Sequence, residues 1–150
     1  MSAGALIFNR DGELLIVKPS YKDHWSIPGG AVEENESPLQ ACIRETDEEI
    51  GLKLLRPGFI SVDYCNDIDK PEKGEALHFI FYGGEIDARE VALLKPALGE
   101  ISEIKFVKLE NASLFLSENL GQKIAKCVEA LKNNTAVYLE NGEIPHVLII

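Results

Sequence analysis

Glutamates are concentrated between residues 36 and 49 of this 150-residue chain, at spacings that favour a common chemical role. Glu45, Glu48 and Glu49 would share one side of a helix, because residues three and four positions apart are neighbours on a helix surface. Like charges placed in this way repel each other, and Arg44 alone cannot neutralise three carboxylates. A hard divalent cation bound by carboxylate oxygens would compensate them, and magnesium fits this type of donor best.

The helix that carries these acids has recognisable ends. Ser37 is a good N-cap, Pro38 suits the first helical position, and Gln40 stands where a capping box has its reciprocal partner. Gly51 can adopt the left-handed conformation that ends a helix. The pattern therefore predicts a helix over residues 38–50, about three and a half turns long.

One side of the predicted helix is apolar and another is acidic. At about 100° per residue, the apolar side consists of Leu39, Cys42, Ile43, Thr46 and Ile50. A solvated surface is the alternative interpretation of the acidic side, since motif matches include false positives. The occurrence of Gly30, Glu36 and Arg44 together with these acids favours a functional role over a merely solvated surface.

The segment 30–52 resembles the Nudix box. In both, a Gly is followed after five residues by Glu, after seven more by Arg-Glu, and then by an apolar residue, any residue, Glu-Glu, any residue, Gly and an apolar residue. The matching positions are Gly30, Glu36, Arg44, Glu45, Glu48, Glu49, Gly51 and Leu52. Thr46 stands where an aliphatic residue is more usual, and it still offers a methyl group to the core.

The resemblance implies an α/β fold, a Nudix-type α/β/α sandwich with a mixed central sheet. It also implies hydrolysis of a phosphoanhydride bond in a nucleoside diphosphate linked to another group, with a small nucleotide such as a nucleoside triphosphate or nucleotide sugar as substrate. Mg²⁺, or alternatively Mn²⁺, would be held by the Gly29 carbonyl, Glu45, Glu48 and Glu49. Glu45 would also be the catalytic base, and Arg44 would orient the glutamates.

Other residues have open roles. Glu36 is either a second-sphere contact near the helix N-terminus, where the helix dipole favours anions, or an outer metal ligand. Glu100 and Glu103 are candidates for a further metal contact or an alternative base, or are plain surface acids. Residues that either stack on a base or belong to the core are Tyr21, His24, Trp25, Tyr64 and His78. Residues that either meet phosphate or are merely solvated are Arg10, Lys18 and Lys22.

Length, charge and cysteine content restrict the function. The length suits one domain, residues 1–150, with a substantial core. A net charge of −10 argues against stable nucleic-acid binding, which needs clustered Lys and Arg. Cys42, Cys65 and Cys127 lack disulfide-framework or zinc-site spacing, and the first and last of these are predicted core residues. Neither a signal-peptide pattern nor a membrane-length apolar run is present, which predicts a cytoplasmic protein without a membrane segment.

Hydrophobic patterning predicts alternating strands and helices. The predicted strands are residues 3–8, 13–17, 25–27, 53–63, 76–82 and 101–108. Residues 66–74 are predicted as a loop and 86–99 as an irregular connection, and a second helix begins near Ser117. Residues 136–140 and 143–150 are predicted as a hairpin around the Asn141-Gly142 turn. The tail 147–150 would be apolar on both strand faces, which a two-stranded hairpin cannot bury by itself. It would therefore pack under the domain or pair with a second copy of the chain, so a homodimer is one option.

Two other classes of function stay open. Nudix-like domains also act as ligand sensors, so a nucleotide-sensing binding module without hydrolysis is the alternative. Such sensors commonly lose box glutamates, whereas this chain keeps all of them. An isoprenoid diphosphate isomerase shares the fold but needs a longer chain and a catalytic cysteine in a distinct setting, and no cysteine here is placed for that role.

Overall fold

The computed structural model describes residues 1–67, 69 and 71–146. A seven-stranded sheet consists of β1 (Ser2–Asn9), β2 (Leu14–Pro19), β3 (Gly29–Ala31), β4 (Gly58–Asn66), β5 (Glu75–Ile86), β6 (Ile101–Val107) and β7 (Val137–Glu140). The helices are α1 (Pro38–Ile50), α2 (Ala88–Leu93) and α3 (Glu118–Lys132), with 3₁₀ helices at Pro71–Lys73 and Leu109–Leu114. The strand order is β6-β2-β1-β5-β4-β7, and β3 pairs with β1.

β1 is the strand around which the sheet is arranged. It pairs antiparallel with β2 and β3 and parallel with β5. Ala5, Leu6 and Ile7 are fully buried, as expected for a strand that is covered on both faces. The mixed central sheet predicted from the sequence is therefore confirmed.

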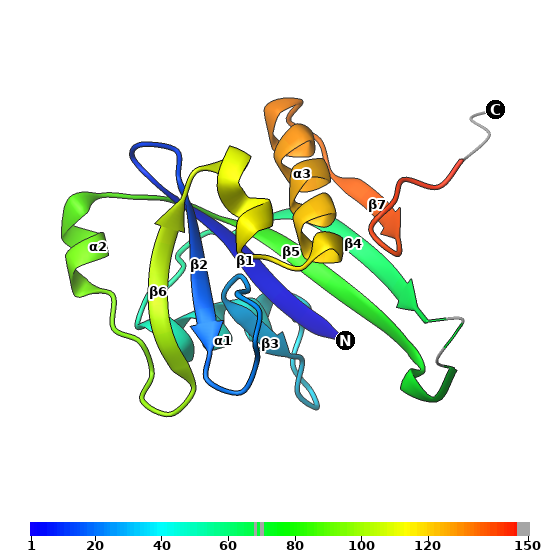
Figure 1. The fold of residues 1–150 in the computed structure, drawn as a ribbon, viewed down its shortest axis with the longest axis horizontal. Helices are drawn as coiled ribbons and strands as arrows, with labels where there is room; N and C mark the ends of the chain where they lie inside the picture. Colours follow the sequence, from blue (N-terminus) through cyan, green and yellow to red (C-terminus); the bar gives the residue numbers. More distant parts are fainter. Residues whose placement is uncertain (68, 70, 147–150) are drawn as a thin grey trace.

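Helices α1 and α3 cover opposite faces of this sheet (Figure 1). Leu15 and Val17 of β2 pack in the hydrophobic cluster that contains α1. Leu14 and Ile16 pack in the cluster that contains α3, because successive residues of a strand point to opposite faces. Two helical layers around one sheet agree with the predicted α/β/α sandwich. Among the helices of the described residues, none is long and apolar enough to cross a membrane.

Helix α1 has the predicted ends. The Gln40 N–H donates to Ser37 Oγ at 3.1 Å, and the Ser37 N–H donates to the Gln40 side-chain oxygen at 2.9 Å, which is a complete capping box. Gly51 ends the helix with φ = 71°, and its N–H donates to the Asp47 carbonyl at 2.8 Å. These local signals fix where the acidic helix begins and ends.

The buried side of α1 agrees with the predicted one except at Leu39, and it also includes Ala41 and Glu49. Cys42 and Ile50 are fully buried as predicted, but Leu39 is 40% exposed. Ala41 is fully buried instead, and Glu49 is only 8% exposed. The helix is therefore turned so that one of its box glutamates faces inward.

The segment 25–27, predicted as a strand, forms only isolated bridges. Ser26 pairs with Val17, and Trp25 pairs with Leu116. Pro28 lacks an N–H and interrupts the ladder, so the strand of this region is β3, which follows the proline. The box is therefore preceded by a turn of irregular backbone against β1 and β2.

Helix α2 lies within residues 86–99, which were expected to be irregular. The Glu90 N–H donates to Asp87 Oδ1 at 2.9 Å, and the Asp87 N–H donates to Glu90 Oε1 at 3.3 Å. This capping box starts a helix of six residues, none of which is buried. A helix that short and exposed has no apolar periodicity from which it could be predicted.

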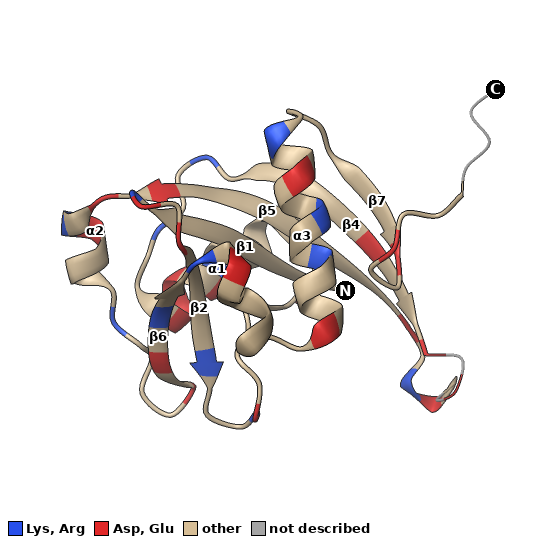
Figure 2. Ribbon diagram, turned by 45° about the horizontal axis from the view of Figure 1, so that its top comes forward, with Lys and Arg blue, Asp and Glu red and all other residues tan. Residues whose placement is uncertain are grey.

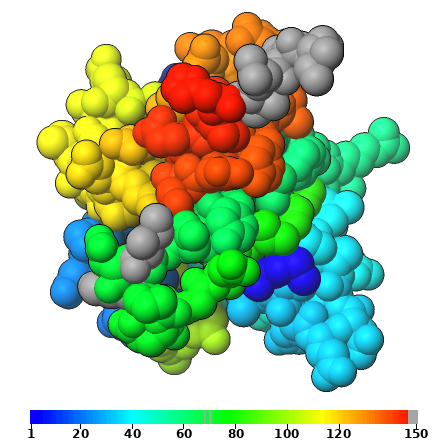
Figure 3. Space-filling model, turned by 90° about the vertical axis from the view of Figure 1, so that its right-hand side faces the viewer, coloured from blue at the N-terminus to red at the C-terminus, as the bar shows by residue number. Residues whose placement is uncertain are grey.

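The predicted turn at Asn141-Gly142 is present and is closed by the pair Glu140–Glu143, but the second strand of the predicted hairpin is wrong over residues 144–146. β7 pairs in parallel with β4, and Figure 3 shows the chain segments of these strands side by side. Glu140 and Glu143 form a single bridge, and no strand follows it in the described residues. The Asn141 N–H donates to the Tyr64 carbonyl at 2.8 Å, so the turn is attached to β4. The tail 147–150, with the dimer predicted from it, lies outside the described residues.

A buried ion pair joins α3 to β4. Lys123 Nζ lies 2.6 Å from Asp63 Oδ2, and the Asp63 side chain is completely buried. Burial by itself raises the pKa of Asp63, but the hydrogen bond from Lys123, with those from the Gly142 N–H and the Cys65 thiol, outweighs it and lowers the pKa. The charged carboxylate is therefore the stable form in the folded protein.

We predict that Asp63→Asn destabilises the protein by about 3–5 kcal/mol at pH 7, because it leaves the buried Lys123 charge without a counterion. The pKa of Asp63 is lower in the folded protein than in the unfolded chain, where it is near 4. The stability that this difference contributes is fully present above the unfolded pKa, and it is lost as the pH falls through the folded pKa. Urea unfolding of both proteins from pH 7 to pH 2 should therefore show the gap closing in acid. A gap that is constant with pH would contradict this assignment.

Candidate functional site

The Gly29-Gly30 pair of β3 brings the sheet against the acidic side of α1. The Gly29 N–H donates to Glu49 Oε1 at 3.1 Å. A Cβ on Gly30 would lie 2.5 Å from the Glu45 carboxyl carbon, so only glycine leaves space for that carboxylate. Two box glutamates are thus held against the backbone of β3.

Arg44 forms hydrogen-bonded ion pairs with three of the box glutamates, Glu36, Glu45 and Glu48. Its Nε and Nη2 atoms lie 2.7 and 2.9 Å from the two carboxylate oxygens of Glu36, a bidentate contact. Its Nη1 lies 2.9 Å from Glu45 Oε1 and 3.1 Å from Glu48 Oε2. Nη2 also donates to the Ala31 carbonyl of β3 at 3.1 Å. The guanidinium group therefore links the loop before α1, the helix and the sheet.

Glu36 acts on the site through Arg44. The Arg44 guanidinium, with the Glu33 N–H, lowers the pKa of Glu36 to about 2. Glu36 is thus a carboxylate at any pH near neutrality. Of the two roles left open for it, this contact favours the second-sphere one.

Glu49 has the opposite electrostatic environment. Its pKa is raised to about 7, mainly by burial and in smaller part by the charges of Glu45 and Glu100, whereas the Gly29 N–H and the Lys22 charge lower it. A carboxyl group that loses its proton near neutrality stands in a site with an excess of negative charge. Such a site favours a cation.

A cavity of about 360 Å³ opens over this cluster. It is polar, and its charged lining residues are Lys22, Glu33, Arg44, Glu45, Glu48, Glu49 and Glu100. Both Gly29 and Gly30 also line it. All four residues predicted to hold metal are therefore brought to one cavity.

In the described part of the chain, no three His, Cys, Asp or Glu side chains are already arranged around a point that could hold a metal ion. Arg44 engages Glu45 and Glu48, and the Gly29 N–H engages Glu49. The donors themselves are carboxylate oxygens, the type that hard divalent cations bind. Their chemistry fits the predicted ion, and their roles as ligands remain predictions.

Glu100 and Glu103 are separated by the fold. Glu100 precedes β6 and lines the acidic cavity, where its charge contributes to the raised pKa of Glu49. Glu103 is exposed on β6, opposite Lys18 of β2, and does not line the acidic cavity. Glu100 thus remains a candidate for a further metal contact or an alternative base, whereas the position of Glu103 is that of a surface acid.

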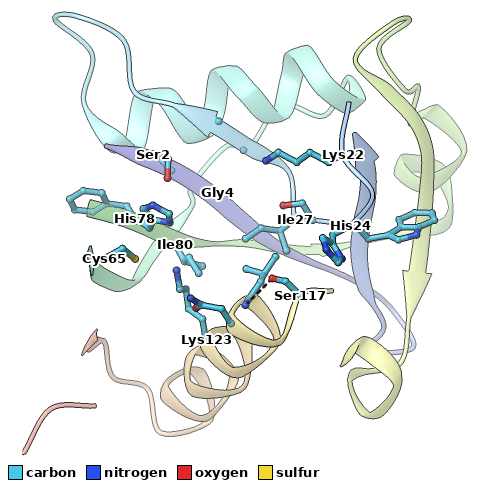
Figure 4. A pocket seen from close by; sticks show the side chains of 18 residues that line it. Ser2, Gly4, Lys22, His24, Ile27, Cys65, His78, Ile80, Ser117 and Lys123 are labelled. Atoms are coloured by element: carbon cyan, nitrogen blue, oxygen red, sulfur yellow. Dashed lines mark hydrogen bonds between the residues drawn. The ribbon is translucent and has the colours of Figure 1, made fainter. Parts of the chain in front are cut away.

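A second cavity, of about 530 Å³, adjoins the first. The two share Lys22, Ser26, Ile27, Gly29 and Gly30 as lining residues. The second extends from there between the sheet and α3, and most of its lining is apolar (Figure 4). Its size and composition are those of a site for a small organic ligand.

The residues predicted to meet the nucleotide divide into two groups. His24, Trp25 and His78 line the second cavity, and Tyr21 lines the acidic one. Tyr64 lines neither, and its hydroxyl donates to Glu75 at 2.8 Å. The aromatic candidates near the box are thus better placed than the one on β4.

Among the predicted phosphate contacts, only Lys22 lines the cavities, and it lines both. Lys18 donates to the Lys22 carbonyl, which fixes the loop that carries Lys22. Arg10 forms an exposed ion pair with Glu85. Lys22 is therefore the basic candidate for a phosphate contact.

Sequence reasoning missed Lys123. It lines the second cavity from α3 and is only 5% exposed. A signal was present, because Lys123 stands three residues after Leu120 and four before Cys127, which places it on the apolar side of the helix. Its partner Asp63 lies far away in the sequence, and no local pattern indicates it.

Comparison with known proteins identifies the family. Residues 1–131 match the family model described as NUDIX domain. An RNA pyrophosphohydrolase of Hydrogenovibrio crunogenus is 46% identical over 52 residues, which are 35% of this chain and 32% of that protein. A Lactococcus lactis protein named "Probable DHNTP pyrophosphohydrolase" is 36% identical over 113 residues, 73% of this chain and 63% of its own length. The chain thus spans about a third of the first relative and less than two thirds of the second.

A solved structure supports the same assignment. The MutT protein from Methanosarcina mazei Go1 superimposes with a TM-score of 0.68 at 25% identity, over 89% of this chain and 93% of that one. The family model covers most of the chain, including the whole box, helix α1 and all but the last residue of α3. This chain belongs to the Nudix family.

Proposed function

We propose that this chain hydrolyses a phosphoanhydride bond in a small nucleotide, in a magnesium-dependent reaction. The observation that carries the proposal is the acidic cavity lined by Gly30, Arg44, Glu45, Glu48 and Glu49 of the box, which adjoins a larger apolar cavity. A diphosphate in the first cavity and a nucleoside in the second would suit this arrangement. Members of the Nudix family generally use divalent metals.

Glu48, Glu49, Glu45 and the Gly29 carbonyl would hold the cation, which supplies charge neutralisation for the diphosphate oxygens. Glu45 is the proposed base, since its carboxylate packs against Gly30 at the cavity wall. Arg44 is a positioning residue, because it bonds Glu45 and Glu48 and fixes both to β3. Mn²⁺ is an alternative ion with the same preference for oxygen donors.

Retention of every box glutamate favours hydrolysis over nucleotide sensing. A sensor needs a cavity for its ligand, but it does not need three carboxylates joined through one arginine with a fourth, Glu49, beside them. Like charges held this close destabilise the free protein unless they serve a bound cation. The pKa of Glu49 is raised mainly by burial and in smaller part by this repulsion from Glu45 and Glu100.

A small nucleotide is proposed rather than an RNA end. The net charge is −10, and acidic residues are spread over many elements in Figure 2. An RNA body would bring further phosphates towards this surface and would be repelled. The RNA pyrophosphohydrolase of Hydrogenovibrio crunogenus matches over 52 residues, and an m7GpppN-mRNA hydrolase of Saccharomyces cerevisiae is 31% identical over 115 residues, which are 73% of this chain and 11% of that protein. RNA ends are therefore tested beside the small nucleotides.

The testing experiment is a substrate panel of nucleoside triphosphates, nucleotide sugars, ADP-ribose, dinucleotides, dinucleoside polyphosphates, and triphosphorylated or capped RNA. With Mg²⁺ we expect a nucleoside monophosphate or equivalent phosphate ester from a small nucleotide, and no product after chelation of the metal. Glu48→Gln/Glu49→Gln should abolish this activity, because it removes two proposed ligand charges.

The matched control is Glu34→Gln/Glu103→Gln, which removes two exposed charges that line neither cavity. It should keep the parent rate. Parent-like turnover by the Glu48→Gln/Glu49→Gln variant would place the reaction elsewhere. More efficient cleavage of RNA than of every small nucleotide would overturn the substrate class.

We further predict that Gly30→Ala lowers kcat/KM by about 100-fold, the effect expected when a catalytic group is displaced by roughly 1 Å. The added Cβ would meet the end of the Glu45 side chain, which can move aside. The thermal midpoint should therefore change little. Steady-state kinetics and calorimetric melting measure the two effects.

Two other alanine substitutions make the test specific. Gly58→Ala adds a Cβ in open space at the start of β4 and should change neither quantity. Gly29→Ala would place its Cβ 2.3 Å from the Ala3 carbonyl oxygen, at φ = 154°, and should destabilise the whole protein. Full activity of Gly30→Ala would show that Glu45 need not occupy its present position.

A further inference from the structure

The second cavity has a polar end that the proposed hydrolysis does not use. Lys123, His78 and Cys65 line this end, and none of them lines the acidic cavity. Figure 4 shows Lys123 reaching from α3 towards the strands that carry His78 and Cys65, with Ile27 and Ile80 between this end and Lys22. A nucleoside bound with its phosphates near Gly29 would direct its base towards Lys123.

The group that faces the cavity at this end is a hydrogen-bond donor. An ammonium group carries three hydrogens and accepts none. In the described part of the chain, Lys123 Nζ is paired with Asp63 Oδ2, which leaves hydrogens for a ligand. The Asp63 carboxylate, which accepts from Lys123, does not itself face a ligand in the cavity. It is completely buried and also accepts from the Gly142 N–H and the Cys65 thiol.

The neighbouring side chains reinforce this polarity. Burial, then the bond to the Asp63 carboxylate, raises the pKa of Cys65 to about 11, so its thiol keeps its proton. Burial and the Lys123 charge lower the pKa of His78, so its ring is neutral near pH 7 and retains one N–H. The Cys65 proton is engaged with Asp63, and the neutral His78 ring has one donor and one acceptor nitrogen. Lys123 is therefore the fixed positive charge at this end of the cavity.

Resting on the function proposed above, we propose that Lys123 selects nucleotides whose base has a 6-carbonyl group, guanine or hypoxanthine, over adenine. Guanine offers two neighbouring acceptors, O6 and N7, which match a lysine ammonium group. Adenine replaces O6 by an amino group, so donor would face donor at Lys123. The Asp63 contact holds the ammonium in place for this discrimination.

The test measures binding of GMP, IMP and AMP by calorimetry in the presence of a chelator, so that neither metal nor turnover is needed. GMP and IMP should bind at least about fivefold more tightly than AMP, the lower range for such a base contact. IMP has the 6-carbonyl group but lacks the 2-amino group of guanine. It therefore separates recognition of O6 from recognition of the amino group.

The variant Lys123→Met/Asp63→Asn removes both charges together and leaves no unpaired ion in the interior. Its ratio of AMP to GMP dissociation constants should fall to about one, while circular dichroism reports the fold. The wild-type comparison decides the proposal even if this variant does not fold. AMP binding that equals or exceeds GMP binding, absence of binding by all three, or an unchanged ratio in the folded variant would each overturn it.

The result is separable from that of the hydrolysis assay. Preferential GMP and IMP binding without turnover of any substrate on the panel would refute the proposed hydrolysis and leave the base preference standing. Turnover of adenine and guanine nucleotides at equal kcat/KM, with equal binding of GMP and AMP, would refute only the base preference.

Discussion

The close approach of the Gly29-Gly30 backbone to α1 is the constraint on which the site depends. No side chain separates the two elements, so Glu49 reaches the Gly29 N–H and Glu45 packs on Gly30. The helix cannot move away without exposing Cys42, which is fully buried beneath it. Core packing therefore holds the Glu45 and Glu49 carboxylates close together, although their like charges repel each other.

Electrostatic compensation within the cluster is uneven. Arg44 neutralises part of the charge of Glu36, Glu45 and Glu48, and it lowers the pKa of Glu36. Glu49 is left outside this network, and burial raises its pKa to about 7. The residual negative charge thus lies at the cavity, because Glu49 lines it and is bonded to the Gly29 N–H instead of to Arg44. This asymmetry is the physical basis for expecting a divalent ion there.

Sequence patterns predicted what is local and failed where contacts are distant. Capping signals at Ser37 and Gly51 gave the correct ends of α1, because each involves residues within one turn. The buried side of α1 was predicted correctly at Cys42, Thr46 and Ile50 but not at Leu39, which is exposed. The burial of Glu49 was missed, because it depends on a contact with the distant Gly29 N–H. The Asp63–Lys123 pair could not be predicted, because it joins β4 to α3 and depends on how the helix crosses the sheet.

The two cavities lie on opposite faces of the sheet and are lined by different helices. The acidic cavity is formed by α1 on one face, and the apolar cavity by α3 on the other, with Gly29 and Gly30 common to both. A change in α3 can therefore alter the shape and polarity of the apolar cavity without moving the carboxylates. Lys123 is such a residue, because its ion pair anchors it to β4 and not to the acidic cluster. Reaction type and ligand preference can accordingly vary independently on this fold, since each depends on a different helix.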